Sequence, residues 1–342
     1  MIVNLISDTV TKPSAAMLEA MFSAEVGDDV FRQDPTVNRL EAYTAELFGK
    51  EAALYCPSGT MTNQIAIKCH TQPLDQIICD QSSHVYQYET GGPAFHSGVS
   101  MKLLKGTHGK ITASQVEEAI EADYDWLPVS RLVVIENTCN KGGGSIYRLP
   151  EVLPIRTLCQ ERGLALHLDG ARLFNALVET QETTKAWGAA FDSISICLSK
   201  GLGAPVGSLL IGDVDFIKKA RRVRKVMGGG MRQAGYIAAA GLYALQNNVE
   251  RLSIDNQRAR QAGAVLQQQS YVSAVRPVQS NIVIFDLAGK LSAADFLATM
   301  EEQGILAVAF GPQTVRLTFH LDISSEMMER VIEVLSNYET AG

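Results

Sequence analysis

Short apolar runs alternate with amphipathic segments along the first 250 residues of the chain. The runs have the length and composition of buried strands, and the segments between them repeat apolar residues at the helical spacing. Because strands and helices alternate, the pattern predicts an α/β fold, with a largely parallel sheet and helices on both faces. The expected strands are 52–56, 76–80, 131–137 and 164–169, and the expected helices are 35–48, 60–68 and 153–162.

The clearest helix ends lie at the segment 35–48. Asp34 can accept hydrogen bonds from the first backbone N–H groups, Pro35 suits the first turn, and Gly49 can end the helix. Further along, the basic run 218–225 is more typical of a solvated helix face than of a nucleic-acid patch.

From about Arg251 the pattern changes. A polar helix, the strand 281–286, a helix over 293–303 and the strand 314–319 precede a last amphipathic helix. This order predicts a small C-terminal α+β domain over 251–342, beside a large domain over 1–250 that includes the N-terminal segment.

The composition and charge exclude several classes of protein. A net charge of −7 and a pI near 5.5 give no attraction to nucleic acid. No run reaches the roughly 20 apolar residues that cross a bilayer, and the N-terminus lacks the features of a secretory signal. The six cysteines are scattered without a CxxC pair, which indicates reduced core residues of a cytoplasmic protein and no zinc site.

One lysine lies where an apolar strand gives way to a glycine-rich loop. Lys200 follows the run 193–197, where an unpaired ammonium group would be costly. A lysine at this position is best explained by an imine bond to a carbonyl cofactor. Pyridoxal phosphate fits, because it needs such a lysine, an acid beside its pyridine nitrogen, and donors for its phosphate. Taken alone, Lys200 would be more typical of a solvated loop.

The acid and the phosphate donors have candidates at other strand ends. Asp169 ends an apolar strand, although alone it could also cap a helix. Ser58, Gly59 and Thr60 lie between a strand and a helix, where free backbone N–H groups and the helix dipole attract a phosphate. Because open α/β sheets bind ligands beyond the carboxyl ends of their strands, the agreement of the three elements favours the cofactor.

Two histidines are predicted to differ in role. His84 follows a strand end and could stack on a planar cofactor, although a surface or core position is the commoner one for a histidine. His167 lies inside an apolar strand and is predicted to be a packed residue.

Eight motifs, in order along residues 4–233, resemble those of the low-specificity L-threonine aldolases, which are fold-type-I pyridoxal phosphate enzymes, and the resemblance runs on to about Asp322. The motifs are NLISDTVTKP (4–13), VGDDV (26–30), DPT (34–36), GKEAA (49–53), PSGTM (57–61), HLDGAR (167–172), CLSKG (197–201) and GGGMRQ (228–233). The resemblance implies a mostly parallel seven-stranded sheet in a cofactor-binding large domain. It also implies cleavage of L-threonine, L-allo-threonine or related L-β-hydroxy-α-amino acids to glycine and an aldehyde, in a homotetramer of two dimers.

The resemblance also implies a role for each candidate residue. Lys200 would carry the cofactor, Asp169 would pair with its pyridine nitrogen, and His84 would stack on its ring. His84 is also the best available base for the substrate hydroxyl, because a neutral imidazole works near pH 7. The phosphate would contact Ser58, Gly59 and Thr60, with Lys225 and Arg232 from a neighbouring subunit. The substrate carboxylate would contact Ser7, Arg172 and Arg316, and Arg172 would also help to bind the cofactor.

Five positions depart from the family pattern. Ile6 stands where relatives generally carry arginine, Phe31 and Arg32 replace a tyrosine and a glycine, and Cys139 replaces a histidine. Trp126 occupies a place where relatives often have a histidine near the substrate side chain. The sequence therefore predicts that Trp126 contacts substrate and that the pocket favours aromatic or bulky side chains.

Three alternatives stay open at this point. The same scaffold could perform β-elimination, racemisation or transamination at the α-carbon. A dinucleotide-binding oxidoreductase fits the α/β pattern alone, but the chain lacks a GxGxxG motif after its first strand and Lys200 would have no role. A binding protein that keeps the fold without turnover is the third.

Overall fold

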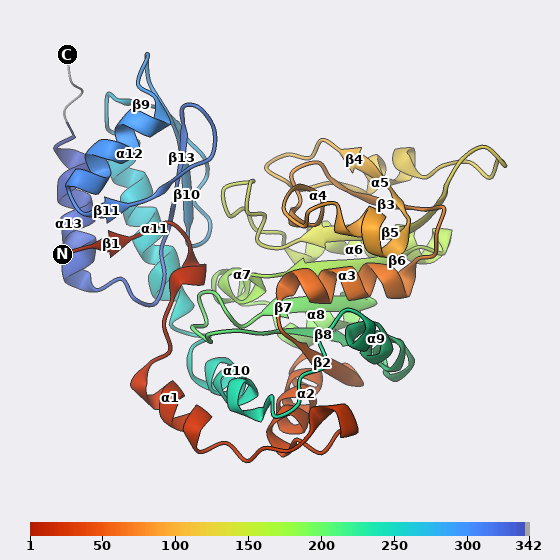
Figure 1. The fold of residues 1–342 in the computed structure, drawn as a ribbon. Coiled ribbons are helices and arrows are strands. Elements are labelled where there is room, and N and C mark those ends of the chain that lie inside the picture. Colours follow the sequence, from red (N-terminus) through yellow and green to blue (C-terminus); the bar gives the residue numbers. More distant parts are fainter. Residues whose placement is uncertain (339–342) are drawn as a thin grey trace.

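The structure, a computed structural model, describes residues 1–338. At its centre is a seven-stranded sheet of order β2-β8-β7-β6-β5-β3-β4 (Figure 1). β8 is antiparallel to both of its neighbours, and the other strands run parallel. The strands are β2 (Ala52–Cys56), β3 (Asp75–Asp80), β4 (Ser100–Leu104), β5 (Val129–Glu136), β6 (Ala165–Gly170), β7 (Ser193–Cys197) and β8 (Ser208–Gly212).

Helices cover both faces of this sheet, as the alternation predicts. α3 and α9 pack on one face, and α2, α6, α8 and α10 lie over the larger core on the other. The helices of this part are α1 (Ala15–Phe22), α2 (Pro35–Phe48), α3 (Gly59–His70), α4 (His84–Gln87), α5 (Ala113–Ala119), α6 (Leu149–Arg162), α7 (Leu173–Thr180), α8 (Thr184–Ala190), α9 (Val214–Val226) and α10 (Gly235–Asn247), with short helical turns at Asp8–Val10, Asp29–Phe31 and Pro93–Ser97.

The C-terminal part has its own antiparallel sheet, of order β12-β13-β10-β9. Its hydrophobic core includes Val3 and Leu5 from the start of the chain, because β1 pairs in parallel with β11. The strands and helices are β1 (Val3–Asn4), β9 (Val272–Val275), β10 (Ile282–Leu287), β11 (Ile305–Leu306), β12 (Val308–Ala309), β13 (Thr314–Thr318), α11 (Leu252–Leu266), α12 (Ala293–Glu302) and α13 (Ser325–Ser336). The chain therefore starts in the C-terminal part and crosses to the large sheet through residues 6–14.

The predicted ends of α2 are confirmed. Asp34 Oδ1 accepts the N–H groups of Thr36 and Val37 at 3.1 and 3.0 Å, and Gly49 ends the helix with a φ of 61°. The basic run does lie on α9, but Arg224 turns inward and pairs with buried Asp29 at 2.6 Å, so the prediction of a solvated face is wrong for this residue.

The predicted packing of His167 and of the cysteines is confirmed, since His167 and all six cysteines are buried and no cysteine forms a disulfide within residues 1–338. Among the helices of these residues, none is long and apolar enough to cross a bilayer. The domain boundary at residue 250 stays a prediction.

Candidate active site

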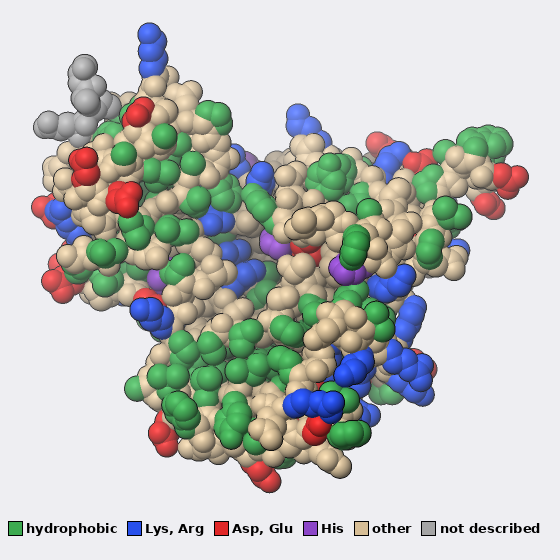
Figure 2. Space-filling model, in the orientation of Figure 1, with side chains coloured by type: hydrophobic (Ala, Val, Ile, Leu, Met, Phe, Trp, Pro, Cys, Tyr) green, Lys and Arg blue, Asp and Glu red, His purple; other side chains and the backbone are tan. Residues whose placement is uncertain are grey.

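The candidate residues lie at the carboxyl ends of the parallel strands. Lys200 comes three residues after β7, Asp169 is the penultimate residue of β6, and His84 begins α4 just beyond β3. Ser58 links β2 to α3. Because these strands run in the same direction, their carboxyl ends share one edge of the sheet. Figure 2 shows a hollow beside the C-terminal part in which basic, acidic and histidine side chains gather.

Asp169 is buried and held from two sides. Its Oδ1 accepts the backbone N–H of Ala171 at 3.2 Å, and its Oδ2 accepts the side-chain amide of Asn63 at 2.9 Å. The alternative that Asp169 caps a helix is wrong, because α7 begins at Leu173 and its capping position is Arg172. A buried carboxylate at a strand end is the acid that a pyridinium ring requires.

His84 has a carboxylate partner that the sequence did not indicate. Its Nδ1 lies 3.0 Å from Oε1 of Glu89, whose side chain is completely buried. Burial lowers the pKa of His84, but the hydrogen bond to Glu89 and the charges of Asp169 and Glu89 outweigh burial, so the pKa is raised from its ordinary value. The only signal in the sequence is an acid five residues after the histidine.

Glu136, at the end of β5, is a second buried acid that the sequence analysis missed. Its two oxygens accept the backbone N–H groups of His84 and Asn140, at 2.8 and 2.9 Å. Burial and the charge of Asp169 raise the pKa of Glu136 to about 7, against the effect of the two N–H donors. Glu136 thus fixes the start of α4 and the loop that carries Asn140.

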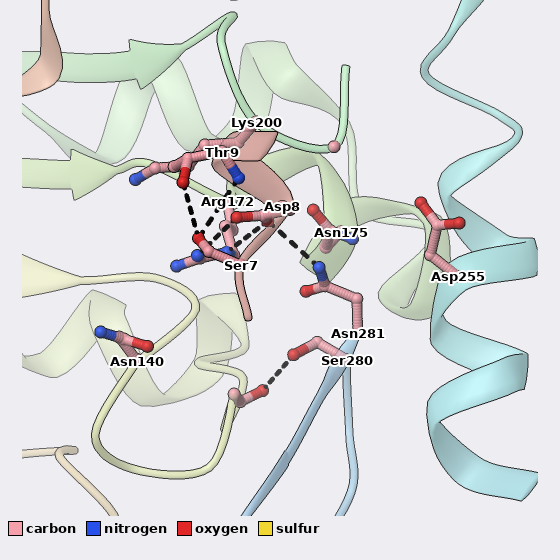
Figure 3. A network of polar contacts seen from close by, with 12 residues as sticks. Ser7, Asp8, Thr9, Asn140, Arg172, Asn175, Lys200, Asp255, Ser280 and Asn281 are labelled. Atoms are coloured by element: carbon pink, nitrogen blue, oxygen red, sulfur yellow. Dashed lines mark hydrogen bonds and ion pairs between the residues drawn. The ribbon is translucent and has the colours of Figure 1, made fainter. Parts of the chain in front are cut away.

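Ser7, Asp8, Arg172 and Lys200 lie close together in Figure 3. Arg172 donates from Nε and Nη2 to the two oxygens of Asp8, at 2.7 Å each. Burial raises the pKa of Asp8, but the charge and hydrogen bonds of Arg172 lower it by a larger amount, so the pKa lies well below its ordinary value. Asn281 donates to Asp8 at 3.1 Å and links this ion pair to the C-terminal sheet.

Arg316 approaches the same region from β13. It donates to Oδ1 of Asn140 and to the backbone carbonyl of Ile6, at 2.8 Å each. Burial and the charge of Arg172 lower the pKa of Arg316 to about 10, so the guanidinium stays charged at neutral pH. Ile6 contributes its backbone carbonyl, which accepts the hydrogen bond from Arg316, and its side chain is exposed. The contact does not depend on the side chain, so an isoleucine can occupy this position.

The start of α3 has the form of an anion site. Ser58 and Thr60 are exposed, and the first N–H groups of a helix have no partner within the helix. A Cβ on Gly59 would lie 2.6 Å from Sγ of Cys197, so only glycine lets the helix start this close to β7.

Lys225 and Arg232 do not contact this turn in the single chain. Lys225 is exposed at the end of α9. Arg232 is exposed as well and pairs with Asp28 at 2.7 Å. Their assignment to the phosphate therefore requires a second subunit.

Trp126 also lies away from the other candidates. Its side chain is 76% exposed and stacks on Tyr124, with ring centroids 4.7 Å apart. It precedes β5, whereas the site lies at the other end of that strand, which places the two roughly 23 Å apart at ~3.3 Å per residue. Figure 1 shows the segment between α5 and β5 at the edge of the molecule.

Three other residues that depart from the family pattern, Cys139, Arg32 and Phe31, differ in their surroundings. Cys139 is buried and its thiol donates to the carbonyl of Glu136 at 3.1 Å, and burial raises its pKa well above the ordinary value. Arg32 has a φ of 60°, a left-handed conformation that suits the glycine of relatives better than arginine. Phe31 is exposed, and the guanidinium of Arg232 lies over its ring, 5.9 Å from the ring centroid.

The chain is similar to known proteins over almost its whole length. A family model for beta-eliminating lyases matches residues 4–290. The low specificity L-threonine aldolase of Escherichia coli (strain K12) is 42% identical over 337 residues, which cover 96% of this chain and 97% of that protein. The low-specificity L-threonine aldolase 1 of Arabidopsis thaliana is 39% identical over 330 residues, or 94% of this chain and 92% of that protein.

A solved structure of Leishmania major threonine aldolase has the same fold. It superimposes with a TM-score of 0.84 at 23% identity, covering 97% of this chain and 98% of that one. At this level of identity the likeness concerns the fold alone, and it confirms the predicted architecture.

Proposed function

Because this chain belongs to the beta-eliminating lyase family, we propose that its site cleaves L-threonine, L-allo-threonine or related L-β-hydroxy-α-amino acids to glycine and an aldehyde. The enzyme is a carbon–carbon lyase that depends on pyridoxal phosphate. The observation that carries the proposal is the gathering of Lys200, Asp169 and His84 at the carboxyl ends of β7, β6 and β3.

The residues present fit this cofactor. Asp169 is buried and held by two hydrogen-bond donors, as an acid beside a pyridine nitrogen would need to be, Lys200 is half-buried on the loop after β7, and the first N–H groups of α3 have no partner within the helix. When bound, pyridoxal phosphate supplies a carbonyl for the amino group and a positively charged ring that withdraws electrons from the α-carbon.

Each protein group at the site would have a separate role in the reaction. Ser7, Arg172 and Arg316 would bind the substrate carboxylate, which the positive charges of the two guanidinium groups attract. The Nε–Nη2 edge of Arg172 is taken by Asp8, so Arg172 would contact substrate only through its remaining N–H groups. His84 would take the proton of the β-hydroxyl group as the Cα–Cβ bond breaks and the aldehyde leaves, and Cα would then take up a proton to give glycine. Lys200 would be the residue that holds the cofactor covalently when no substrate is bound.

Several assignments depend on an assembly of more than one chain. Lys225, Arg232 and Trp126 are exposed and lie away from this chain's own site, so contact with cofactor or substrate would require a neighbouring subunit. We propose that the chain forms a cytoplasmic homotetramer in which Lys225 and Arg232 reach the phosphate of a neighbouring site. The proposal predicts that the purified protein sediments as a tetramer in analytical ultracentrifugation, and a monomer would contradict it.

The products of the reaction test the function. The purified holoenzyme is incubated with L-threonine, L-allo-threonine, phenylserine and L-serine, and glycine, aldehyde, pyruvate and ammonia are measured. Glycine with an equal amount of aldehyde supports aldol cleavage. Pyruvate and ammonia would indicate β-elimination instead, and cofactor binding without any turnover would indicate a binding protein.

A further inference from the structure

We propose that Glu89 is a positioning residue for His84. Glu89 takes the hydrogen bond of the protonated Nδ1, so that Nε2 keeps the lone pair that receives the substrate's hydroxyl proton. The inference rests on the proposed function, in which His84 is the base. It adds which nitrogen of the imidazole does the work and which side chain selects that nitrogen.

The surroundings of Glu89 show that its carboxylate only accepts hydrogen bonds. Oε1 accepts the amide of Asn63 at 2.9 Å and lies 3.0 Å from Nδ1 of His84, while Oε2 accepts the amide of Gln64 at 2.5 Å. The Glu89 side chain is completely buried. Because both oxygens of Glu89 face amide N–H donors, Glu89 is the acceptor in its contact with His84, and Nδ1 is the donor.

The direction of the Asn63 amide is fixed from its other side. Its nitrogen faces two carboxylates, Glu89 and Asp169, at 2.9 Å each. Its oxygen lies 3.2 Å from Nε2 of buried His167, whose Nδ1 lies 2.8 Å from the hydroxyl of Ser193. Burial and the neighbouring His70 lower the pKa of His167 to about 3, so His167 is neutral and donates from Nε2 to Asn63.

Gln64 is fixed by a close backbone approach. A Cβ on Gly92 would lie 2.6 Å from Cδ of Gln64, so the glycine allows the chain after α4 to fold onto the Gln64 amide. This fold brings Glu89 back over α3 and against His84. The segment from α4 to Gly92 therefore places the acid, and α3 holds it through two consecutive amides.

Other charged and titratable groups face His84 as well. These are Asp169, Lys200, the carboxylate of Glu136 on the His84 backbone N–H, and the ring of Tyr88 with its centroid at 5.5 Å. The pKa of His84 lies above its ordinary value of 6.5. Since the imidazole acts as a base only when neutral, activity should rise with pH through this pKa, and losing the charge of Glu89 should move the rise to lower pH.

Two substitutions separate the charge of Glu89 from its hydrogen bond. In Glu89→Gln the amide oxygen still accepts the Nδ1 proton. Its NH₂ group can donate to Oε1 of Gln64 once the Gln64 amide turns over, since Nε2 of Gln64 faces Glu89 in the wild type and Oε1 has no hydrogen-bond partner among the described residues. In Glu89→Leu both the charge and the acceptor are lost. Glu41→Gln is the matched control, because Glu41 is another buried acid, bonded to Tyr55 and Arg221.

The readouts are ¹⁵N NMR of labelled histidine in the apoenzyme and the pH dependence of kcat in the holoenzyme. By NMR, we expect the Nδ1–H tautomer of His84 both in the wild type and in Glu89→Gln. In the kinetic measurement, we expect the acidic limb of the Glu89→Gln kcat profile to lie at lower pH than that of the wild type. In Glu89→Leu we expect mixed tautomers and a kcat lower by about 10- to 100-fold, with KM little changed. Glu41→Gln should leave the His84 signals and the acidic limb in place.

Wild-type His84 protonated at Nε2 in the apoenzyme would overturn the inference, as would a Glu89→Gln profile identical to that of the wild type. If Glu89→Leu fails to fold, the Glu89→Gln profile still decides. A wild-type holoenzyme that releases no glycine would contradict the proposed function instead, and the tautomer measurement would remain valid without it.

Discussion

Lys200 is the residue on which the chemistry depends most directly. It is half-buried, and its own carbonyl accepts the hydroxyl of Thr11 at 2.9 Å, which ties the loop after β7 to the N-terminal segment. We expect Lys200→Ala to lose the visible absorption of the bound cofactor and nearly all turnover while keeping its circular dichroism. Borohydride reduction and peptide mapping of the wild type should label Lys200, and a label on any other lysine would contradict the assignment.

At the residue scale, the sequence predicts the groups that end strands and misses their partners. Lys200 and Asp169 stand out because each follows an apolar run and precedes a loop. Glu89 and Asn63 do not stand out, because their roles come from contacts between α3 and the segment after α4. A polar residue inside a helix pattern carries no sign of which carboxylate it will meet.

Among the elements, α3 is positioned most tightly at its first residue. Gly59 lies against Cys197 of β7, and a Cβ at this position would be 2.6 Å from the sulfur. We expect Gly59→Ala to push the start of the helix outward and to weaken cofactor binding by about tenfold, which corresponds to ~1.4 kcal/mol of overpacking. Absorbance titration of the apoenzyme with pyridoxal phosphate measures this change.

A second substitution tests the steric cause. Cys197→Ala removes the sulfur, so the double variant Gly59→Ala/Cys197→Ala should recover most of the lost affinity, whereas Cys197→Ala alone should bind the cofactor nearly as well as the wild type. A double variant as weak as Gly59→Ala would show that the sulfur is not the obstacle.

At the element scale, the alternating pattern predicts five strands of the large sheet and misses β4 and β8. The apolar run of β8 looks like that of the parallel strands, so its antiparallel direction follows only from its place between β2 and β7. The helix predicted from residue 153 begins four residues earlier, at Leu149. Pro150 lies in its first turn, where proline is favoured, and Pro154 lies inside α6.

Across the whole molecule, the ion pair of Asp8 and Arg172 joins the N-terminal segment to the large sheet. We expect Asp8→Asn to lower the free energy of unfolding by about 3–5 kcal/mol, because it leaves a buried guanidinium without its charge partner. Asp28→Asn is the control, since its partner Arg232 is 61% exposed and the loss should be about 1 kcal/mol or less. Urea denaturation measures both, and equal losses would contradict the prediction.

The same pair predicts the sign of a pH effect. The pKa of Asp8 is lowered from its ordinary value of 3.8, so the ion pair contributes its full stabilisation above that pH and loses it as the pH falls further. Wild type and Asp8→Asn should therefore become more alike in stability as the pH is lowered below 3.8.

Trp126 is the residue whose role depends on the assembly. In the single chain it stacks on Tyr124 at the surface, so contact with substrate requires that it enter the site of a neighbouring subunit. An indole adds apolar area and one donor but cannot exchange a proton, so phenylserine should exceed threonine in kcat/KM. Trp126→His should narrow this difference by raising activity on threonine, and an unchanged ratio would show that Trp126 does not face the substrate.

Mixed oligomers test whether the site is shared. Lys200→Ala and Trp126→Ala chains are each purified, then unfolded and refolded together. If Trp126 enters the site of a neighbouring subunit, a mixed assembly contains some sites that combine an intact Lys200 from one chain with an intact Trp126 from the other. Activity on phenylserine should then exceed the sum of the two separate variants. Activity equal to that sum, with mixed oligomers verified by mass spectrometry, would mean that each chain's site uses only its own residues at these two positions.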